Sequence, residues 1–303
     1  MGRAFQFVWE VVLIEYIQAF ILKWPVLVDF FRVVTLLGEE VVAVLILGTI
    51  YWGYDKKWGS YSILYLLFGQ LSNNMIKNIF QRLRPYFVNE SIQCLKPPAK
   101  TGDLYDPIVQ GFSFPSGHTT CITSIMTCFW LKLKDRKVFF YLLPIVLLVG
   151  TSRFALGVHY PTDVLMGLVL GFFGILLIDL GYRKTRKEHL YLALLILSLA
   201  GMSFCRSEDY FAVAGILIGF MAGDLIEERY IHFENTRRIP VIIARVLLGG
   251  ILTLAIVELL KLPVQNLADG SMAALLYRSF RYAFASAIAF GFYPYLFKYK
   301  FLK

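Results

Sequence analysis

Long apolar runs recur along the whole chain, and they constrain its fold more than any other feature. A helix of about 20 apolar residues crosses a bilayer, and in lipid only helices and closed barrels satisfy all their own backbone hydrogen bonds. Charged residues make up 17% of the 303 positions, against about a quarter in soluble domains. The sequence therefore predicts an all-α, polytopic membrane helical bundle of about nine transmembrane helices, near residues 40–54, 60–80, 116–132, 138–155, 161–182, 189–205, 209–227, 240–260 and 271–296.

The first 36 residues form a separate segment in this prediction. They are apolar, but Glu10 and Glu15 interrupt the run that would otherwise cross the membrane. Two carboxylates near the centre of a span are expensive. We therefore expect residues 1–36 to form an N-terminal interfacial helical segment, with one or two helices lying at the membrane surface.

Basic residues alternate from loop to loop. By the positive-inside rule, the loops rich in Lys and Arg face the cytoplasm; they are 55–57, 132–137, 183–187, 229–238 and the tail 298–303. The net charge of +9 then reflects topology, and we expect no nucleic-acid partner. The opposite, extracytoplasmic or lumenal face also carries cations, namely Lys77, Arg82, Arg84 and Arg153, which topology does not require.

The stretch from Ser152 to Asp163 joins two predicted spans and concentrates reactive groups. It contains Arg153, His159 and Asp163. Pro161 suits the first turn of a helix, which would place Asp163 in that turn. Its carboxylate could then return to the imidazole of His159 and fix the tautomer of the ring. The alternative is an ordinary polar loop between two membrane helices.

Two further clusters lie on the same predicted face. One runs from Lys77 to Arg84 and Pro85, and the other contains Ser116, Gly117 and His118. Alone, the cations could be anchors at a helix end, and Ser116 could be a helix cap. Together they would form an anion site, because guanidinium and ammonium groups and a helix N-terminus all bind phosphate oxygens. No Cys, His or acidic cluster has metal-ligand spacing, so we expect no metal and no cofactor.

The three clusters read Lys-x6-Arg-Pro, Pro-Ser-Gly-His and Ser-Arg-x5-His-x3-Asp. Over residues 60–180 the chain thereby resembles the type-2 phosphatidic acid phosphatase family, which includes vanadium haloperoxidases. The resemblance implies metal-independent hydrolysis of a phosphomonoester or diphosphate through a phosphohistidine. It implies His159 as nucleophile, Asp163 as its orienting partner and His118 as the acid for the leaving group. The implied phosphate-binding residues are Lys77, Arg84, Ser116, Gly117 and Arg153.

We therefore divide the chain into the N-terminal interfacial segment 1–36, a catalytic phosphatase membrane core 37–183 that carries the three motifs, and additional C-terminal transmembrane helices 184–303. The nine-span count resembles the glucose-6-phosphatase branch, whereas Asp163 follows the lipid-phosphatase pattern. We therefore expect a multi-pass integral membrane enzyme whose partner is a lipid phosphate or diphosphate. Alternatives are a phosphatase of a soluble sugar phosphate, a lipid phosphotransferase, and a non-catalytic lipid binder or transporter.

Overall fold

The structure is a computed structural model that describes residues 5–96, 103–262, 270–299 and 301–303. These residues form helices and connecting segments, with no β-strand among them, so the prediction of an all-α chain is confirmed for the described residues. The chain divides into two compact units. Unit 1 comprises Met1–Ala43 and Ser72–Asp179, and unit 2 comprises Val44–Leu71 and Leu180–Lys303.

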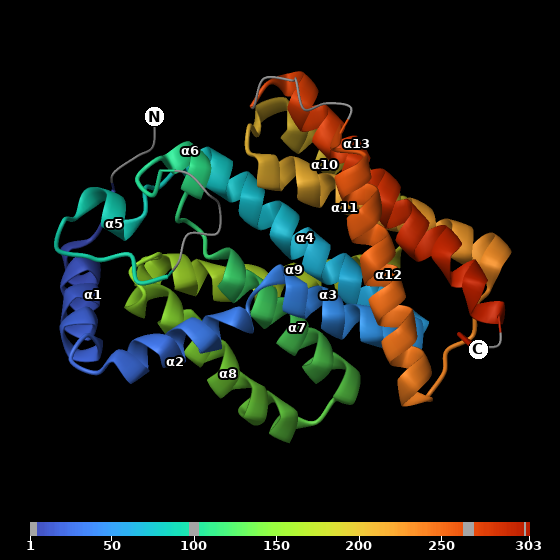
Figure 1. Ribbon diagram of the computed structural model, residues 1–303, viewed down its shortest axis with the longest axis horizontal. Helices are drawn as coiled ribbons and strands as arrows, with labels where there is room; N and C mark the ends of the chain where they lie inside the picture. Colours follow the sequence, from blue (N-terminus) through green and yellow to red (C-terminus); the bar gives the residue numbers. More distant parts are fainter. Residues whose placement is uncertain (1–4, 97–102, 263–269, 300) are drawn as a thin grey trace. The chain divides into compact units, whose positions relative to one another are not determined.

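Unit 1 contains the N-terminal helices and the three motif clusters (Figure 1). Proline occupies the start of several of its helices, where its missing N–H has no cost, and Ser116 caps α7. The helices of this unit are α1 (Val8–Ile21), α2 (Pro25–Leu36), α5 (Pro85–Val88), α6 (Pro107–Gln110), α7 (Gly117–Leu133) and α8 (Arg136–Ala155), together with the end of α4 (Lys56–Phe80) and most of α9 (Pro161–Lys184).

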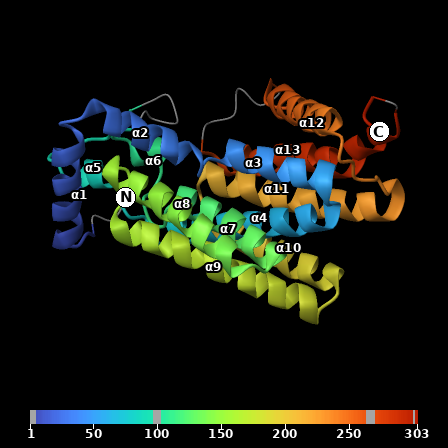
Figure 2. The same cartoon turned by 90° about the horizontal axis from the view of Figure 1, so that it is seen from below.

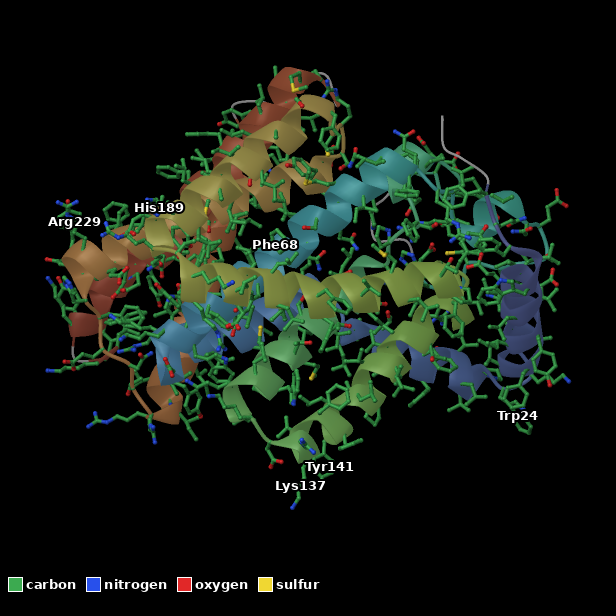
Figure 3. All side chains as sticks on the ribbon, turned by 180° about the vertical axis from the view of Figure 1, so that it is seen from behind. Trp24, Phe68, Lys137, Tyr141, His189 and Arg229 are labelled. Atoms are coloured by element: carbon green, nitrogen blue, oxygen red, sulfur yellow. The ribbon has the colours of Figure 1, made fainter. Side chains whose placement is uncertain are left out.

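The N-terminal segment is two helices that meet at an angle of 119°. Trp24 lies at their junction and points outward, with 58% of its surface exposed (Figure 3). The opposite side packs on α5 and the end of α8, as Figure 2 shows. Nε2 of Gln18 in α1 donates to the carbonyl of Gln93, in the segment after α5, at 2.8 Å, and to the carbonyl of Ala155, the last residue of α8, at 3.3 Å. The buried apolar cluster between these elements consists of Ile14, Ile21, Val28, Tyr86, Ile92, Leu95, Ala155, Leu156, Val158 and Tyr160.

Small residues bring α7 and α9 into close contact. A Cβ atom on Gly167 would lie 2.8 Å from the carbonyl oxygen of Ser116, and one on Gly171 would lie 2.6 Å from Cβ of Thr123. Glycines one turn apart let two helix backbones approach closely, as in membrane helix pairs. The N-terminus of α7 therefore lies against the first turns of α9, which sets two of the three motif clusters side by side.

Unit 2 contains the rest of α4 and most of α3 (Glu40–Thr49) with its π-helical end Ile50–Tyr54, followed by α10 (Lys187–Phe204), α11 (Glu208–Ile226), α12 (Ile239–Leu259) and α13 (Met272–Ala287). Gly215 and Gly219 of α11 lie against the backbone of α13 at Ser279 and Ala283. A buried carboxylate, Asp224, accepts hydrogen bonds from Ser60 at 2.7 Å and Tyr191 at 2.8 Å.

In the part of the chain that the structure describes, five helices are long and apolar enough to cross a membrane: α8, α9, α10, α11 with its extension to Ile231, and α12. The bent pair α1 and α2 would count as a sixth. Apolar side chains at the start of α8 face outward, including Tyr141, which is 73% exposed (Figure 3). The predicted spans at 40–54, 60–80, 116–132 and 271–296 are largely helical but shorter or more polar, so nine spans remain a prediction.

Candidate active site

His159 and Asp163 meet at the start of α9. Both side chains are buried, and Nδ1 of His159 lies 3.5 Å from Oδ2 of Asp163. The backbone N–H of Tyr160 donates to the same oxygen at 2.7 Å, which fixes the carboxylate against the turn. The imidazole contact is longer than an ordinary hydrogen bond of about 3 Å, and such contacts often shorten when substrate binds.

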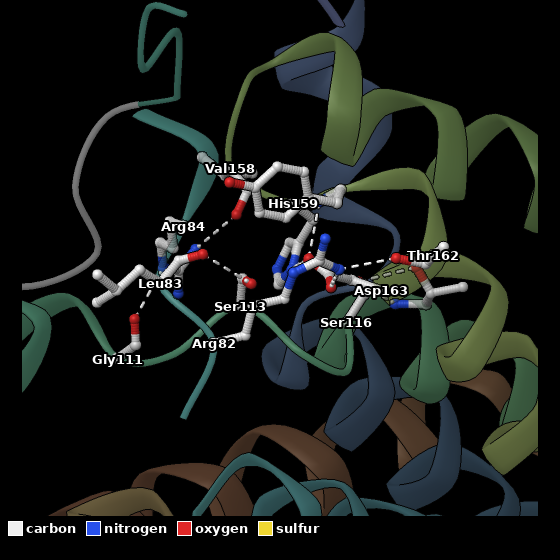
Figure 4. A network of polar contacts seen from close by, with 12 residues as sticks. Arg82, Leu83, Arg84, Gly111, Ser113, Ser116, Val158, His159, Thr162 and Asp163 are labelled. Carbon is white, nitrogen blue, oxygen red and sulfur yellow. Dashed lines mark hydrogen bonds and ion pairs between the residues drawn. The ribbon is translucent and has the colours of Figure 1, made fainter. Parts of the chain in front are cut away.

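The other oxygen of Asp163 has a partner that the motifs did not assign. Nη1 of Arg82 donates to Oδ1 of Asp163 at 2.7 Å and to Oγ1 of Thr162 at 2.7 Å, and dashed lines in Figure 4 mark these contacts. In the sequence, Arg82 is only a cation that topology does not require. A buried guanidinium in contact with the carboxylate of Asp163 therefore extends the candidate site beyond the predicted residues.

Arg153 and Arg84 reach the site from different elements. The Arg84 guanidinium donates to three backbone carbonyls, those of Gln110 at 2.7 Å, Gly111 at 3.1 Å and Val158 at 3.3 Å (Figure 4). Nη1 of Arg153 donates to Oγ1 of Thr35 at 2.5 Å, whereas its buried Nε has no hydrogen-bond partner among the described residues. Since an unpaired buried donor is costly, a bound phosphoryl oxygen would suit this nitrogen.

These cations act on His159. Burial of the ring, followed by the positive charges of Arg153, Arg84 and Lys77, lowers the pKa of His159 well below its ordinary value. The imidazole is therefore neutral at pH 7 and keeps a lone pair. A neutral imidazole beside several fixed cations is suited to attack an anionic phosphoryl group.

Ser116 lies at the N-terminus of α7, also in contact with α9. Its Oγ accepts a hydrogen bond from the hydroxyl of Thr119 at 2.9 Å, and its N–H donates to the backbone carbonyl of Asp163 at 3.0 Å. Ser116 can therefore be both a helix cap and a phosphate ligand, because a hydroxyl oxygen that accepts a capping hydrogen bond can still donate its own O–H to an anion. Gly117 and His118 follow in the first turn of α7, where backbone N–H groups favour anions.

His118 has two charged neighbours that the motifs do not include. Nζ of Lys96 lies 3.1 Å from Nε2 of His118, and it also lies 3.1 Å from Oε1 of Glu39. The contact with His118, followed by Lys96, lowers the pKa of Glu39 to about 2. The sequence carried no signal for Lys96, which lies in a long polar loop, and Glu39 belongs to none of the three motifs.

Among the described residues, no group of three His, Cys, Asp or Glu side chains is placed to hold a metal ion. The site instead gathers Lys77, Arg84, Arg153 and a helix N-terminus around a neutral imidazole that has a carboxylate beside it. Fixed cations of this kind can stabilise the charge of a phosphoryl group in transfer.

Comparisons with known proteins agree with this arrangement. Residues 58–187 match the PAP2 superfamily, and residues 211–302 match the PAP2 superfamily phosphatase, transmembrane extension. Phosphatidylglycerophosphatase B of Bacillus subtilis (strain 168) is 32% identical over 169 residues, which cover 50% of this chain and 74% of that protein. The chain belongs to the PAP2 superfamily. The family predicted from the three motifs is thus confirmed.

Other PAP2 relatives match over shorter stretches. A lipid A 1-phosphatase of Rhizobium johnstonii is 30% identical over 113 residues, or 37% of this chain and 43% of that protein. Undecaprenyl-diphosphatase BcrC of Bacillus subtilis is 34% identical over 102 residues, or 34% of this chain and 46% of that protein. No solved structure matches the chain. As a member of this family of phosphatases, the protein is a phosphoric monoester or diphosphate hydrolase.

Proposed function

We propose that this PAP2 protein is an integral membrane phosphatase that hydrolyses a lipid phosphate or diphosphate through a phosphohistidine at the extracytoplasmic or lumenal face. One observation carries the proposal: a buried, neutral His159 lies 3.5 Å from Asp163 and within the field of several cations. The residues supplied by the chain itself suffice for both steps of such a reaction.

In the first step, Nε2 of His159 attacks phosphorus while its Nδ1–H faces Asp163. The bond between phosphorus and the leaving oxygen breaks, and His118 donates a proton to that oxygen. In the second step, His118 removes a proton from water, the water oxygen attacks phosphorus, and the P–N bond breaks to release inorganic phosphate. Lys77, Arg84 and Arg153 hold the phosphoryl oxygens, so their charge acts where negative charge is concentrated.

The lipid substrate is supported by the relatives and by the architecture. The names of the relatives given above all describe phosphatases of lipid phosphates or diphosphates. A substrate held in the bilayer reaches a site at the ends of spans by lateral diffusion, and its headgroup carries the phosphate. In this proposal the protein crosses the membrane nine times. Residues 1–36 form the N-terminal interfacial segment, residues 37–183 form the catalytic membrane core, and residues 184–303 form the additional C-terminal transmembrane helices.

The proposal is tested with purified protein in detergent and a panel of substrates. Inorganic phosphate release is measured for a polyprenyl diphosphate, phosphatidylglycerophosphate, phosphatidic acid and glucose 6-phosphate, with and without EDTA. We expect a lipid to be preferred, activity to survive EDTA, vanadate to inhibit, and His159→Ala to lose both turnover and the trapped phosphoenzyme. A folded His159→Ala protein with wild-type turnover would contradict the nucleophile, and a preference for glucose 6-phosphate over every lipid would contradict the substrate.

A further inference from the structure

A buried chain of charges connects the N-terminal helix to the carboxylate of Asp163, which forms the proposed catalytic triad with His159 and His118. Glu10 of α1 and Arg82 are 0% and 1% exposed, and Oε2 of Glu10 lies 2.6 Å from Nη2 of Arg82. Nη1 of the same guanidinium lies 2.7 Å from Oδ1 of Asp163. Arg82 therefore bridges two carboxylates from segments far apart in the sequence, and one of these carboxylates faces His159.

A second contact attaches Glu10 directly to the start of α9. Its Oε1 accepts hydrogen bonds from the hydroxyl of Thr162 at 2.5 Å and from the backbone N–H of Thr162 at 3.1 Å. Nη1 of Arg82 also donates to that hydroxyl at 2.7 Å, as the dashed lines in Figure 4 indicate. Thr162 immediately precedes Asp163, so Glu10 and Arg82 hold the turn that carries the triad carboxylate.

Aromatic rings surround the guanidinium of Arg82 and shield it from solvent. The guanidinium lies 3.8 Å from the ring centre of Tyr160 and 4.9 Å from that of Phe5. Its Nε donates to the carbonyl of Phe5 at 2.9 Å. A buried charge is costly unless it is paired and hydrogen-bonded. The cluster contains one more acidic than basic group, and its Asp163 carboxylate lies beside His159.

We propose that Glu10 and Arg82 are positioning residues of the catalytic triad, which hold Asp163 in place and supply the net negative charge that stabilises the phosphorylated ring of His159. This inference rests on the proposed function, in which His159 is the nucleophile. When Nε2 bonds to phosphorus and Nδ1 keeps its hydrogen, the ring becomes a cation. Asp163 stays ionised as the acceptor of that N–H, and no additional proton moves.

The pH dependence of kcat/KM should differ between two cases, one in which Glu10 only anchors the fold and one in which its charge acts on His159. Charged or titratable groups face His159 from several elements: Arg153 of α8, Lys77 of α4, Arg84 and His118 of α7. Asp163 lies beside the ring on the same turn, and it is paired with Arg82, which is paired in turn with Glu10. His159 must be neutral and Asp163 ionised for the attack, so protonation of either group contributes to an acid limb in kcat/KM. Loss of the Glu10 charge disfavours the protonated ring and moves that limb to lower pH. An anchor without an electrostatic role would leave the limb unchanged.

The first experiment compares Glu10→Gln with Glu15→Gln, using a lipid phosphate and purified protein. Glu15 is a matched control on the same helix, since it accepts a hydrogen bond from Ser91 at 2.5 Å at the exposed surface. We expect Glu10→Gln to lower kcat by about tenfold, to leave KM within about twofold, and to move the acid limb down by about half a pH unit. Glu15→Gln should match wild type. A folded Glu10→Gln protein with wild-type kcat and limb overturns the inference.

Arg82→Lys provides a second variant that keeps the charge. One ammonium cannot reach both carboxylates and Thr162 in the geometry of a guanidinium fork. We expect kcat to fall while the acid limb keeps its wild-type position, because the net charge is unchanged. An Arg82→Lys protein with wild-type kcat contradicts the positioning role.

A double-mutant cycle asks whether Glu10 acts through Asp163. In an Asp163→Asn background, Glu10→Gln should cause little further loss of kcat, because interacting residues are not additive. Full additivity would show that Glu10 acts independently of Asp163 and would overturn the inference. These results are separable from the proposed function: an active His159→Ala protein removes the nucleophile itself, whereas an unaltered Glu10→Gln protein removes only the positioning role.

Discussion

The ammonium of Lys96 lies 3.1 Å from Nε2 of His118. This contact places a cation next to the group that protonates the leaving oxygen in the proposed mechanism. When a lipid monophosphate is hydrolysed, the leaving group is an alcohol, which is uncharged once it is protonated. When a lipid diphosphate is hydrolysed, the leaving group is a phosphate monoester, which remains an anion. The contact therefore bears on which leaving groups the enzyme accepts.

We expect Lys96→Met to lower kcat/KM for a polyprenyl diphosphate by about tenfold more than for a phosphatidic acid. The physical reason is that Lys96 offsets charge on the departing phosphate, and the monophosphate has none to offset. Lys137→Met is the control, because Lys137 is an exposed cation at the start of α8 (Figure 3). Equal losses of kcat/KM for both substrates would show that Lys96 acts only through His118, and they would contradict a role of Lys96 at the leaving group.

The pH dependence of kcat/KM should report the low pKa of His159. Burial and the cations around the ring lower this pKa, so the neutral, reactive form persists as pH falls below about 6.5. Lys77→Met removes one of these cations, which raises the pKa of His159 and moves the acid limb to higher pH. Comparison of variant with wild type on one substrate cancels the ionisation of the substrate itself. A limb that stays in place, or moves down, contradicts the proposed influence of Lys77.

Much of this site could be predicted from the sequence because its residues occur in short motifs. His159 and Asp163 are four positions apart on either side of Pro161, so local helix geometry alone brings them together. Ser116 precedes an apolar run and caps a helix, which was the alternative to its predicted role in binding phosphate. The all-α fold also followed directly from the length and recurrence of the apolar runs.

The missing parts depend on contacts between distant segments. Glu10 read as a charge that disfavoured a span, and nothing local indicated that Arg82, 72 positions away, would neutralise it. Lys96 reaches His118 from a loop that has no regular pattern. Such pairings are set by how helices pack, and glycines such as Gly167 control this packing through single close approaches that hydropathy does not reveal.

Close packing between α7 and α9 makes Gly167 a sensitive position. A Cβ atom there would lie 2.8 Å from the carbonyl oxygen of Ser116 and 2.9 Å from Cβ of Thr119. We expect Gly167→Val to destabilise the protein by about 1–3 kcal/mol through overpacking. The loss of phosphatase activity should exceed the loss of folded protein, because the N-terminus of α7 must move away from α9.

The control for this substitution is Gly250→Ala, since nothing lies within 4 Å of the Cβ that it adds to α12. Thermal unfolding in detergent and phosphate release are measured on both proteins. A Gly167→Val protein with wild-type melting temperature and turnover would show that α7 and α9 can separate without loss of stability. That result would contradict the importance of the close contact at Gly167.

Cys94 offers a test of the side of the membrane on which the site lies. The other cysteines, at 121, 128 and 205, are buried, whereas Cys94 is partly exposed. Its Sγ contacts the carbonyl of Lys96 at 3.4 Å, and burial raises the pKa of its thiol. Because the thiolate is the reactive form, labelling by a membrane-impermeant maleimide should be slow at pH 7 and accelerate as pH rises. With the site extracytoplasmic, intact cells or right-side-out vesicles should be labelled, and Cys94→Ser should remove the signal. Labelling that appears only after the membrane is opened would place the site on the cytoplasmic side.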